Sequence, residues 1–499
     1  MDRILRILLG LIAAVVTYLL LPSLAWEARF TATVAVLMAA WWILEAIPLE
    51  VTALVPLVAF PLAGVLSASE AAAPYADRVI ILFLGGFLIA VSMERWNLHR
   101  RIALLVVSWV GTGTRRIVLG FMVATAGISL FISNTATAMM MIPIALALAT
   151  TVAAGAGGEG PGEGSTSFTR CLILGCAYAA SIGGVGTLIG SPPNGIFAAQ
   201  LAALFPGAPQ LDFFTWLLFG IPFVAIFLPL AWLWLTRGAF RDLPDRIPLA
   251  GEVIRREQAA LGPLSRGEAW TLLVFLMVGL GWIFEETKVV GGIVIPGLDQ
   301  VFPGITDATI AMAGAILLFL LPVDSRKGIF TMDWEHALKI PWGILILFGG
   351  GLALSAAIVT SGLALAMVEP FTLLRGIPVP VIILVVVTAV IFLTELTSNT
   401  AIASIMMPVT AVLAVTLGVN PVLLMLSAAV AASLGFMLPV GTPPNAIAHG
   451  TGKVPLRVMV RTGFVLNLMA IVLWTLFSLT WLPWVLGIDT GLPAWVTVP

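Results

Sequence analysis

The tripeptide Ser-Asn-Thr interrupts long apolar stretches twice, at Ser133-Asn134-Thr135 and at Ser398-Asn399-Thr400. Each copy is followed by a Pro-Pro-Asn turn, at Pro192-Pro193-Asn194 and at Pro443-Pro444-Asn445. Backbone groups released from helical hydrogen bonding at membrane depth are tolerated only where protein buries them or where they line a wet cavity. Two matching interruptions therefore predict one binding site that two halves of the chain share.

Composition explains why these interruptions are placed in a membrane. Of the 499 residues, 60% are hydrophobic and only 10% are charged, which excludes a soluble domain and predicts an all-α polytopic membrane protein in a lipid bilayer. The formal net charge of -1 gives no reason to expect a nucleic-acid partner. The first apolar run, about residues 4–21, lacks a small-residue cleavage site and is expected to remain as a span. Cys171 and Cys176 are expected to pack as small buried side chains.

An internal repeat connects the two motif sets. Ile81-Leu82-Phe83 and Ile346-Leu347-Phe348 share one offset with the Ser-Asn-Thr copies, 265 (398 minus 133). The Pro-Pro-Asn turns have an offset of 251 (445 minus 194). The difference of 14 residues (265 minus 251) is about the length of a Gly/Glu/Ser-rich loop near residues 155–168 that the second half lacks. The chain is therefore expected to contain two homologous units.

These observations predict four segments. They are a first transmembrane span in residues 1–28, repeat 1 in 29–236, a cytoplasmic linker in 237–266, and repeat 2 in 267–499. About five spans in each repeat would give inverted-topology copies and about 11 transmembrane helices in total. Each repeat would contain a re-entrant hairpin with its tip at 133–135 or 398–400, and a broken helix with its unwound turn at 190–194 or 441–445.

The distribution of basic residues predicts the orientation. Residues 237–266 contain six arginines, whereas the loop with Glu285, Glu286 and Lys288 is poor in basic residues. By the positive-inside rule the arginine-rich segment is cytoplasmic. Arg3 and Arg6 place the N-terminus on the same side, and about eleven spans then leave the C-terminus outside. The expected location is the cytoplasmic (inner) membrane.

The motif residues favour an ion and anion site. Ser, Asn and Thr are suited to helix N-caps, so helix N-termini are expected to face the cavity and offer N–H groups to an anion. Proline frees carbonyl groups at Gly190 and Gly441. No lysine or arginine occurs in residues 117–169 or 376–452, so a bound anion would need another cation to neutralise it. Carbonyl, hydroxyl and amide oxygens suit a hard monovalent cation such as sodium.

The motifs closely resemble those of the divalent anion:sodium symporter family of dicarboxylate and citrate carriers. The resemblance also includes residues 42–48, Trp-Ile-Leu-Glu-Ala-Ile-Pro, and residues 99–104, His-Arg-Arg-Ile-Ala-Leu, and it covers nearly the whole chain. It implies a homodimer whose protomers each have a scaffold domain and a transport domain. It further implies an elevator motion in which the transport domain carries sodium and a dicarboxylate across the membrane.

The family pattern implies specific ligands. One sodium site would use Ser129, Ser133, Asn134 and the Gly190 carbonyl, and a second would use Thr394, Thr397, Asn399 and the Gly441 carbonyl. The substrate carboxylates would meet Ser133, Asn134, Thr135, Ser398, Asn399, Thr400, Thr442, Pro443 and Ser191. Because both tripeptides are intact, the resemblance favours a carboxylate substrate over sulfate. The expected substrate is a C4-dicarboxylate of the succinate, malate and fumarate class.

Several alternatives remain at this level. The family includes exchangers as well as sodium symporters, and citrate, 2-oxoglutarate or sulfate could replace a C4-dicarboxylate. A channel would favour a continuous pore with repeated rings of charges or carbonyls. An enzyme would need a nucleophile with a base, or a metal constellation, and the three histidines share no such spacing, so no enzymatic activity is expected. Glu395, whose repeat counterpart is Leu130, favours a structural hydrogen-bonding role, and His449 favours a satisfied position at the cavity edge.

Overall fold

The computed structural model describes residues 2–111, 113–155, 163–245, 250–290 and 293–496. The described chain is overwhelmingly helical, as the composition predicts. Its strands form two small antiparallel hairpins, one from β1 (Lys288–Val290) with β2 (Ile293–Ile295) and the other from β3 (Pro322–Asp324) with β4 (Ile329–Phe330).

Eight described helical segments are long and apolar enough to cross a bilayer. They are α1 (Arg3–Leu20), α2 (Trp26–Leu44), the segment 68–95 that ends in α6 (Arg78–Arg95), α12 (Phe213–Leu233) with a π-helical turn (Trp234–Ala239), α14 (Arg266–Ile283), α17 (Trp342–Thr360), α20 (Asn399–Leu417) and α23 (Leu456–Leu486). Shorter apolar helices include α15 (Asp307–Leu320), α19 (Val379–Thr394) and α21 (Pro421–Ala431). Several of these short helices are halves of interrupted spans, which is why length alone would miss them.

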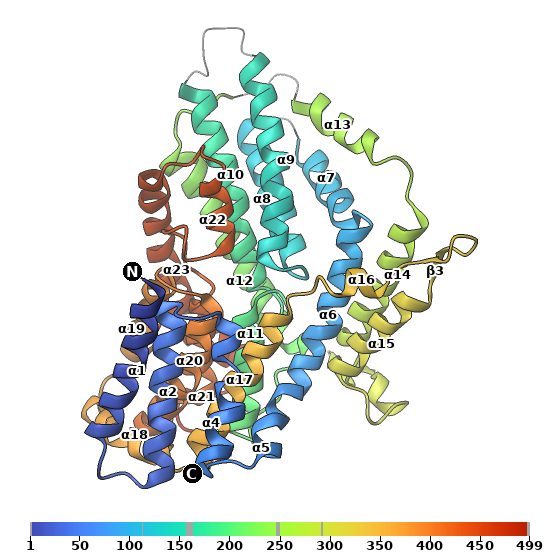
Figure 1. Cartoon of the computed structure of the whole chain (residues 1–499). Helices are drawn as coiled ribbons and strands as arrows, with labels where there is room; N and C mark the ends of the chain where they lie inside the picture. Colours follow the sequence, from blue (N-terminus) through green and yellow to red (C-terminus); the bar gives the residue numbers. More distant parts are fainter. Residues whose placement is uncertain (1, 112, 156–162, 246–249, 291–292, 497–499) are drawn as a thin grey trace.

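Both Ser-Asn-Thr motifs lie where two helices meet in a hairpin. The helix α8 (Thr114–Ser129) ends just before the first motif, and α9 starts within it and covers Asn134–Gly155. In the second hairpin α19 ends at Thr394 and α20 starts at Asn399. In Figure 1 the α8–α9 hairpin extends from the upper end of the molecule, whereas α18 (Leu363–Phe371), which precedes α19, lies at the lower end.

Both Pro-Pro-Asn turns begin the second half of a broken helix. In the first, α10 (Glu163–Gly184) stops and α11 (Pro192–Leu204) resumes after seven residues, 185–191. In the second, α21 stops at Ala431 and α22 (Pro443–Gly450) resumes after residues 432–442. Proline occupies the first turn of both resumed helices, where its missing N–H has no intrahelical partner to lose.

The broken helices exchange partners between the two halves of the chain. The resumed helix α11 packs against α20 of the second hairpin, while α22 packs against α9 of the first. Each hairpin also packs against its own broken helix, through α8 and α9 with α10 and through α20 with α21. The four interruptions are therefore held in one contiguous region.

The connecting helices complete the chain. The segment 237–266, expected to be a polar linker, contains α13 (Ala250–Ala260), which packs on α7 (Leu98–Val110). Gln258 Nε2 donates to the Leu104 carbonyl at 3.0 Å, and Arg100 pairs with Glu257 at 2.5 Å. The remaining short helices are α3 (Leu49–Thr52), α4 (Val55–Ala63), α5 (Ala68–Ala72), α16 (Trp334–Ala337) and the 3-10 turns Ala73–Ala76, Leu298–Gln300 and Thr372–Leu374.

The repeated Ile-Leu-Phe segments of α6 and α17 meet face to face. The rings of Phe83 and Phe348, which are 265 residues apart (348 minus 83), pack edge to face with centroids 5.0 Å apart. Gly195 of α11 lies against both rings, because a Cβ built there would come within 2.3 Å of Phe83 and 2.8 Å of Phe348. The start of α11 is thus held between two aromatic side chains from the two halves of the chain.

The beginning of α12 docks onto α14 and α15 beside a group of carboxylates. The Phe213 N–H donates to Asp307 Oδ2 at 3.0 Å, and the Phe213 ring lies 4.3 Å from that of Trp282. Asp212 lies 3.7 Å from Lys288, and Glu285 is buried with 7% of its surface exposed. Burial, followed by the nearby carboxylates of Asp307 and Asp212, raises the pKa of Glu285 to about 8.

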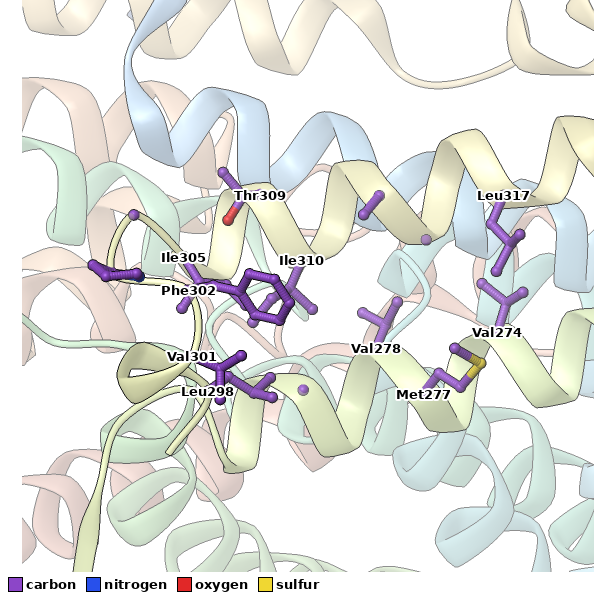
Figure 2. Close-up of a pocket in the computed structure, with 15 residues that line it drawn as sticks. Val274, Met277, Val278, Leu298, Val301, Phe302, Ile305, Thr309, Ile310 and Leu317 are labelled. Carbon is purple, nitrogen blue, oxygen red and sulfur yellow. The ribbon is translucent and has the colours of Figure 1, made fainter. Parts of the chain in front are cut away.

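An apolar cavity of about 700 Å³ lies between α14 and α15. Figure 2 shows its lining, in which Val278, Phe302 and Ile310 are typical side chains. Thr309 is the only labelled lining residue with a side-chain oxygen, and its hydroxyl is bonded to Thr306. None of the lining side chains is charged, so this cavity does not fit the ion and anion site expected from the sequence.

Candidate functional site: two matched helix breaks

Each helix break consists of a hairpin tip and the loop of the broken helix that packs beside it. In the first break, the last residue of α8 is hydrogen-bonded to the first residue of α9. The Ser129 hydroxyl lies 2.6 Å from Asn134 Oδ1 and 2.8 Å from the Ala180 carbonyl of α10. Gly190 packs against the same cluster, since a Cβ built on it would lie 3.0 Å from the Ser129 carbonyl oxygen. The structure therefore brings together Ser129, Asn134 and Gly190, three of the predicted sodium ligands.

The second break repeats this arrangement. The Thr394 hydroxyl lies 2.6 Å from Asn399 Oδ1 and 2.9 Å from the Ala432 carbonyl at the end of α21. The amide of Asn399 has two alternative orientations. In one, its nitrogen donates to Thr394 Oγ1 and to the Gly441 and Ala432 carbonyls at 2.6, 2.7 and 3.2 Å; in the other, its oxygen faces the same oxygens. The second orientation gives an all-oxygen cluster of the kind that holds a hard cation.

The Pro-Pro-Asn asparagines brace the loops between the helix halves. Asn194 Nδ2 donates to the Gly184 carbonyl at 3.0 Å and to the Thr187 carbonyl at 2.8 Å. Asn445 Nδ2 donates to the Gly435 and Leu438 carbonyls at 3.3 and 3.1 Å, each acceptor 251 residues after its counterpart (435 minus 184 and 438 minus 187). Carbonyl groups released by the breaks thus regain donors. The repeat offset therefore preserves hydrogen-bonding geometry as well as sequence.

The two broken helices touch directly. Ser191, the N-cap residue of α11, lies with its hydroxyl oxygen 2.9 Å from that of Ser433 in the second break, and both residues are buried. Thr442 caps α22 by accepting a hydrogen bond from the Asn445 N–H at 3.4 Å. Ser191 and Thr442 therefore belong to the central region expected from the sequence, and each already has a local partner.

The tripeptide residues themselves are half-buried, in contrast to the fully buried Ser129 and Thr394 beneath them. This description applies to Ser133, Asn134, Thr135, Ser398, Asn399 and Thr400. Ser133 Oγ accepts from the Ala136 N–H at 3.3 Å, which caps the first turn of α9. At both hairpin tips, partly exposed polar side chains therefore lie at the start of a helix, where backbone N–H groups are free of intrahelical partners. Pro443 is exposed at the start of α22.

Thr397 is oriented differently from the other proposed ligands. Its hydroxyl donates to the carbonyl of Trp42 in α2 at 3.3 Å, so that side chain connects the second hairpin to α2. A sodium contact from Thr397 would have to come from its main-chain carbonyl. The repeat pattern does not reveal this difference, because the corresponding residue in the first half is Ile132.

The Glu395 side chain supports the loop of the second break through hydrogen bonds. Its carboxylate accepts from the Met437 and Leu438 N–H groups, both at 2.8 Å, and from Asn467 Nδ2 at 2.8 Å. Asn467 in turn accepts from the Phe436 N–H at 3.1 Å. Glu395 is 2% exposed, so these bonds replace the water that an ionised carboxylate would otherwise require. The contacts agree with the structural role that its lack of a repeat counterpart suggested, and they add Asn467, which no motif indicated.

The other residues noted in the sequence have structural environments. Cys171 and Cys176 are buried free thiols, which confirms their predicted packing role. His449 Nδ1 lies 2.9 Å from the Val454 carbonyl and is satisfied locally. Within the described ranges no group of three or more His, Cys, Asp or Glu side chains is arranged to hold a metal ion.

The interrupted helices and their polar clusters are those of a polytopic membrane transport protein. Residues 2–488 match the family described as the sodium:sulfate symporter transmembrane region. The chain belongs to this family, which confirms the family resemblance found in the sequence. It is accordingly a transporter and not an enzyme.

Curated relatives match almost from end to end. A sodium-dependent dicarboxylate transporter of Staphylococcus saprophyticus, SdcS, is 42% identical over 99% of this chain and 94% of its own length. The SdcS transporter of Staphylococcus aureus is 40% identical, over 97% of this chain and 93% of its own length. This coverage includes both hairpins and both broken helices.

Two solved transporter structures share the fold at low sequence identity. The YdaH transporter of Alcanivorax borkumensis has a TM-score of 0.55 and 15% identity, with 86% of this chain and 89% of that chain covered. MtrF of Neisseria gonorrhoeae has a TM-score of 0.56 and 12% identity, with 85% and 86% covered. These similarities support the helical fold.

Proposed function

We propose that this protein couples sodium ions to the movement of a C4-dicarboxylate, of the succinate, malate and fumarate class, across the cytoplasmic membrane. The observation that carries the proposal is the matched pair of oxygen clusters, Ser129 with Asn134 and Thr394 with Asn399. The names of the curated relatives, sodium-dependent dicarboxylate transporters, support the same substrate and coupling ion.

Each cluster would hold one sodium ion. The first set is Ser129, Ser133, Asn134 and the Gly190 carbonyl; the second is Thr394, Thr397, Asn399 and the Gly441 carbonyl. Because residues 117–169 and 376–452 contain no lysine or arginine, sodium would supply the positive charge that a dicarboxylate needs in this low-dielectric region. The substrate carboxylates would meet the half-buried tripeptides and the N-termini of α9 and α20.

The proposed transport cycle moves the whole site. The hairpins and broken helices, interlocked through the α9–α22 and α11–α20 contacts, would travel as one rigid body against a scaffold that includes α1 to α4, α14 and α15. The scaffold would form a homodimer, with the N-terminus cytoplasmic and the C-terminus outside. Repeats 29–236 and 267–499, joined by the linker 237–266, would be inverted in the membrane.

Uptake by purified protein in liposomes tests this function. Labelled succinate should accumulate when sodium is outside and remain near background when potassium replaces it. Malate and fumarate should compete, while citrate, 2-oxoglutarate and sulfate define the width of the specificity. Equal uptake with sodium and potassium would contradict sodium coupling, and uptake only against preloaded dicarboxylate would indicate an exchanger.

A further inference from the structure

A polar pocket lies away from the helix breaks, between the start of α10, the end of α12 and the start of α23. Its volume is about 330 Å³, and its lining includes Arg170, Trp234, Gly238, Phe240, Arg457 and Arg461. The three arginines come from two different helices, α10 and α23. In Figure 1 the upper ends of α10 and α23 lie near each other. The pocket thus combines convergent positive charge with aromatic walls.

Among the described residues these arginines have no carboxylate partner. None of the ion pairs in the described part of the chain involves Arg170, Arg457 or Arg461. Arg170 has one weak hydrogen bond, from Nε to the Lys453 carbonyl at 3.4 Å. By contrast, Arg95, Arg100 and Arg101 elsewhere each pair with an acidic side chain within 2.7 Å. The pocket therefore has an excess of positive charge that the described protein does not neutralise.

Helix stabilisation does not account for these arginines. Arg457 lies in the first turn of α23, and Arg461 follows one turn later on the same face. The N-terminal end of a helix carries partial positive charge, so an arginine in the first turn is electrostatically unfavourable there. An anion bound between Arg457 and Arg461 would offset this repulsion, and the partial positive charge of the helix end would stabilise it further.

The aromatic wall is fixed by the π-helical turn at the end of α12. Trp234 Nε1 donates to the Thr462 carbonyl at 3.1 Å, which ties this turn to α23 beside Arg461. Gly238 lets the indole lie against the backbone, since a Cβ there would fall 2.1 Å from Trp234 Cε3. Single π-helical turns are often found at functional sites. Trp234 is therefore fixed relative to α23, the helix that carries Arg457 and Arg461.

We infer that this pocket binds a phosphate-bearing anion. Guanidinium groups offer paired N–H donors that match phosphate oxygens, and three guanidinium groups from two helices suit a tetrahedral anion better than a single planar carboxylate. Two sources fit this chemistry: the phosphodiester of an anionic lipid head group and free phosphate. The inference is independent of the sodium and dicarboxylate sites, because it uses none of their residues.

Lipid binding to the purified full-length protein tests the first source. Phosphatidylglycerol should remain bound in native mass spectra after detergent exchange, and Arg457→Gln/Arg461→Gln should weaken that binding at least about tenfold. Arg115→Gln/Arg116→Gln is the matched control, because it removes the same charge from the start of α8. The Arg115 carbonyl accepts from Trp232 near the end of α12, yet neither arginine lines the pocket. The control should bind the lipid like the unaltered protein.

Calorimetric titration of the delipidated protein with inorganic phosphate tests the second source. Binding of either probe that the double variant loses and the control keeps supports the site, and the probe that binds identifies the source. Equal binding of both probes by the unaltered protein and the double variant, or an equal loss in the control, would overturn it. If the double variant elutes as an aggregate, Arg170→Gln provides the same test with one charge removed.

Discussion

The two helix breaks carry the same polar residues at their tips but are braced by different side chains behind them. In the second break the carboxylate of Glu395 holds the Met437 and Leu438 N–H groups. In the first, the corresponding position is Leu130, whose main-chain carbonyl accepts a hydrogen bond from the Thr187 hydroxyl. The comparison separates two requirements: the groups proposed to face the ligands stay alike, whereas the support behind them has diverged.

Removing Glu395 should give the largest difference between the breaks. Glu395→Ala leaves the half-buried Met437 and Leu438 N–H groups and the buried Asn467 amide without their acceptor, so we expect a loss on the order of 3 kcal/mol in stability. Sodium affinity measured by uptake should fall as well, because residues 436–441 carry the Gly441 carbonyl. The matched variant Leu130→Ala should cost less and leave sodium dependence nearly intact. Unchanged unfolding and sodium dependence in Glu395→Ala would show that the brace is dispensable.

The asparagines should show that the breaks are alike where ligands bind. Asn134→Ala and Asn399→Ala each remove an amide that is proposed to contact both sodium and substrate, so each should weaken coupled binding by about 2 kcal/mol. Succinate binding at varied sodium measures this loss. Leu384→Ala, at a half-exposed position of α19, serves as the control and should keep normal uptake. A normal sodium-dependent response from only one asparagine variant would break the equivalence.

Gly195 gives a smaller and one-sided effect. Gly195→Ala places a methyl group against Phe83 and Phe348, and overpacking of this kind costs about 1–3 kcal/mol. The residue 251 positions later (446 minus 195) is Ala446, which is exposed, so Ala446→Gly should cost only the lower helix propensity of glycine, about 1 kcal/mol. Thermal unfolding of both variants in detergent gives the comparison. Equal unfolding midpoints for the two would contradict the tight aromatic contact at α11.

The smallest expected effect lies outside both breaks, at Glu285. Its folded pKa, about 8, is above that of an unfolded glutamate, so the folded state binds this proton more tightly. The resulting stabilisation is complete below about pH 4.5 and is lost as pH rises through about 8. The unfolding midpoint should fall over this range by a few degrees, and Glu285→Gln should flatten the dependence. As the control, Glu286→Gln at the neighbouring exposed position should keep the pH dependence of the unfolding midpoint. A pH dependence that Glu285→Gln leaves unchanged would contradict a raised pKa at Glu285.

Much of the architecture was predictable because the repeated motifs consist of residues that cap or interrupt helices. Proline and N-capping residues have local effects, so the positions of both hairpin tips and both resumed helices follow from sequence alone. The pairing of Ser129 with Asn134 was reached only through the family resemblance. Its physical basis is that Ser129 ends one helix and Asn134 starts the next.

The remaining features depend on contacts between distant segments. Glu395 and Asn467 are 72 residues apart, and no repeated spacing connects them. The side chain of Thr397 points to Trp42 because α2 packs against α20, which a one-dimensional pattern cannot express. Likewise, Arg170 and Arg457 belong to separate helices and form one pocket only after folding.

The exchange of partners between the broken helices has a consequence for biosynthesis. Since α9 packs against α22 and α11 against α20, the first half of the chain leaves the ribosome with polar breaks whose partners have not yet been made. The polar groups of the first break therefore stay without their packing partners, in the membrane or beside an insertion factor, until residues beyond 399 are synthesised. Two separately translated halves should therefore be inert alone and regain activity when they are produced together.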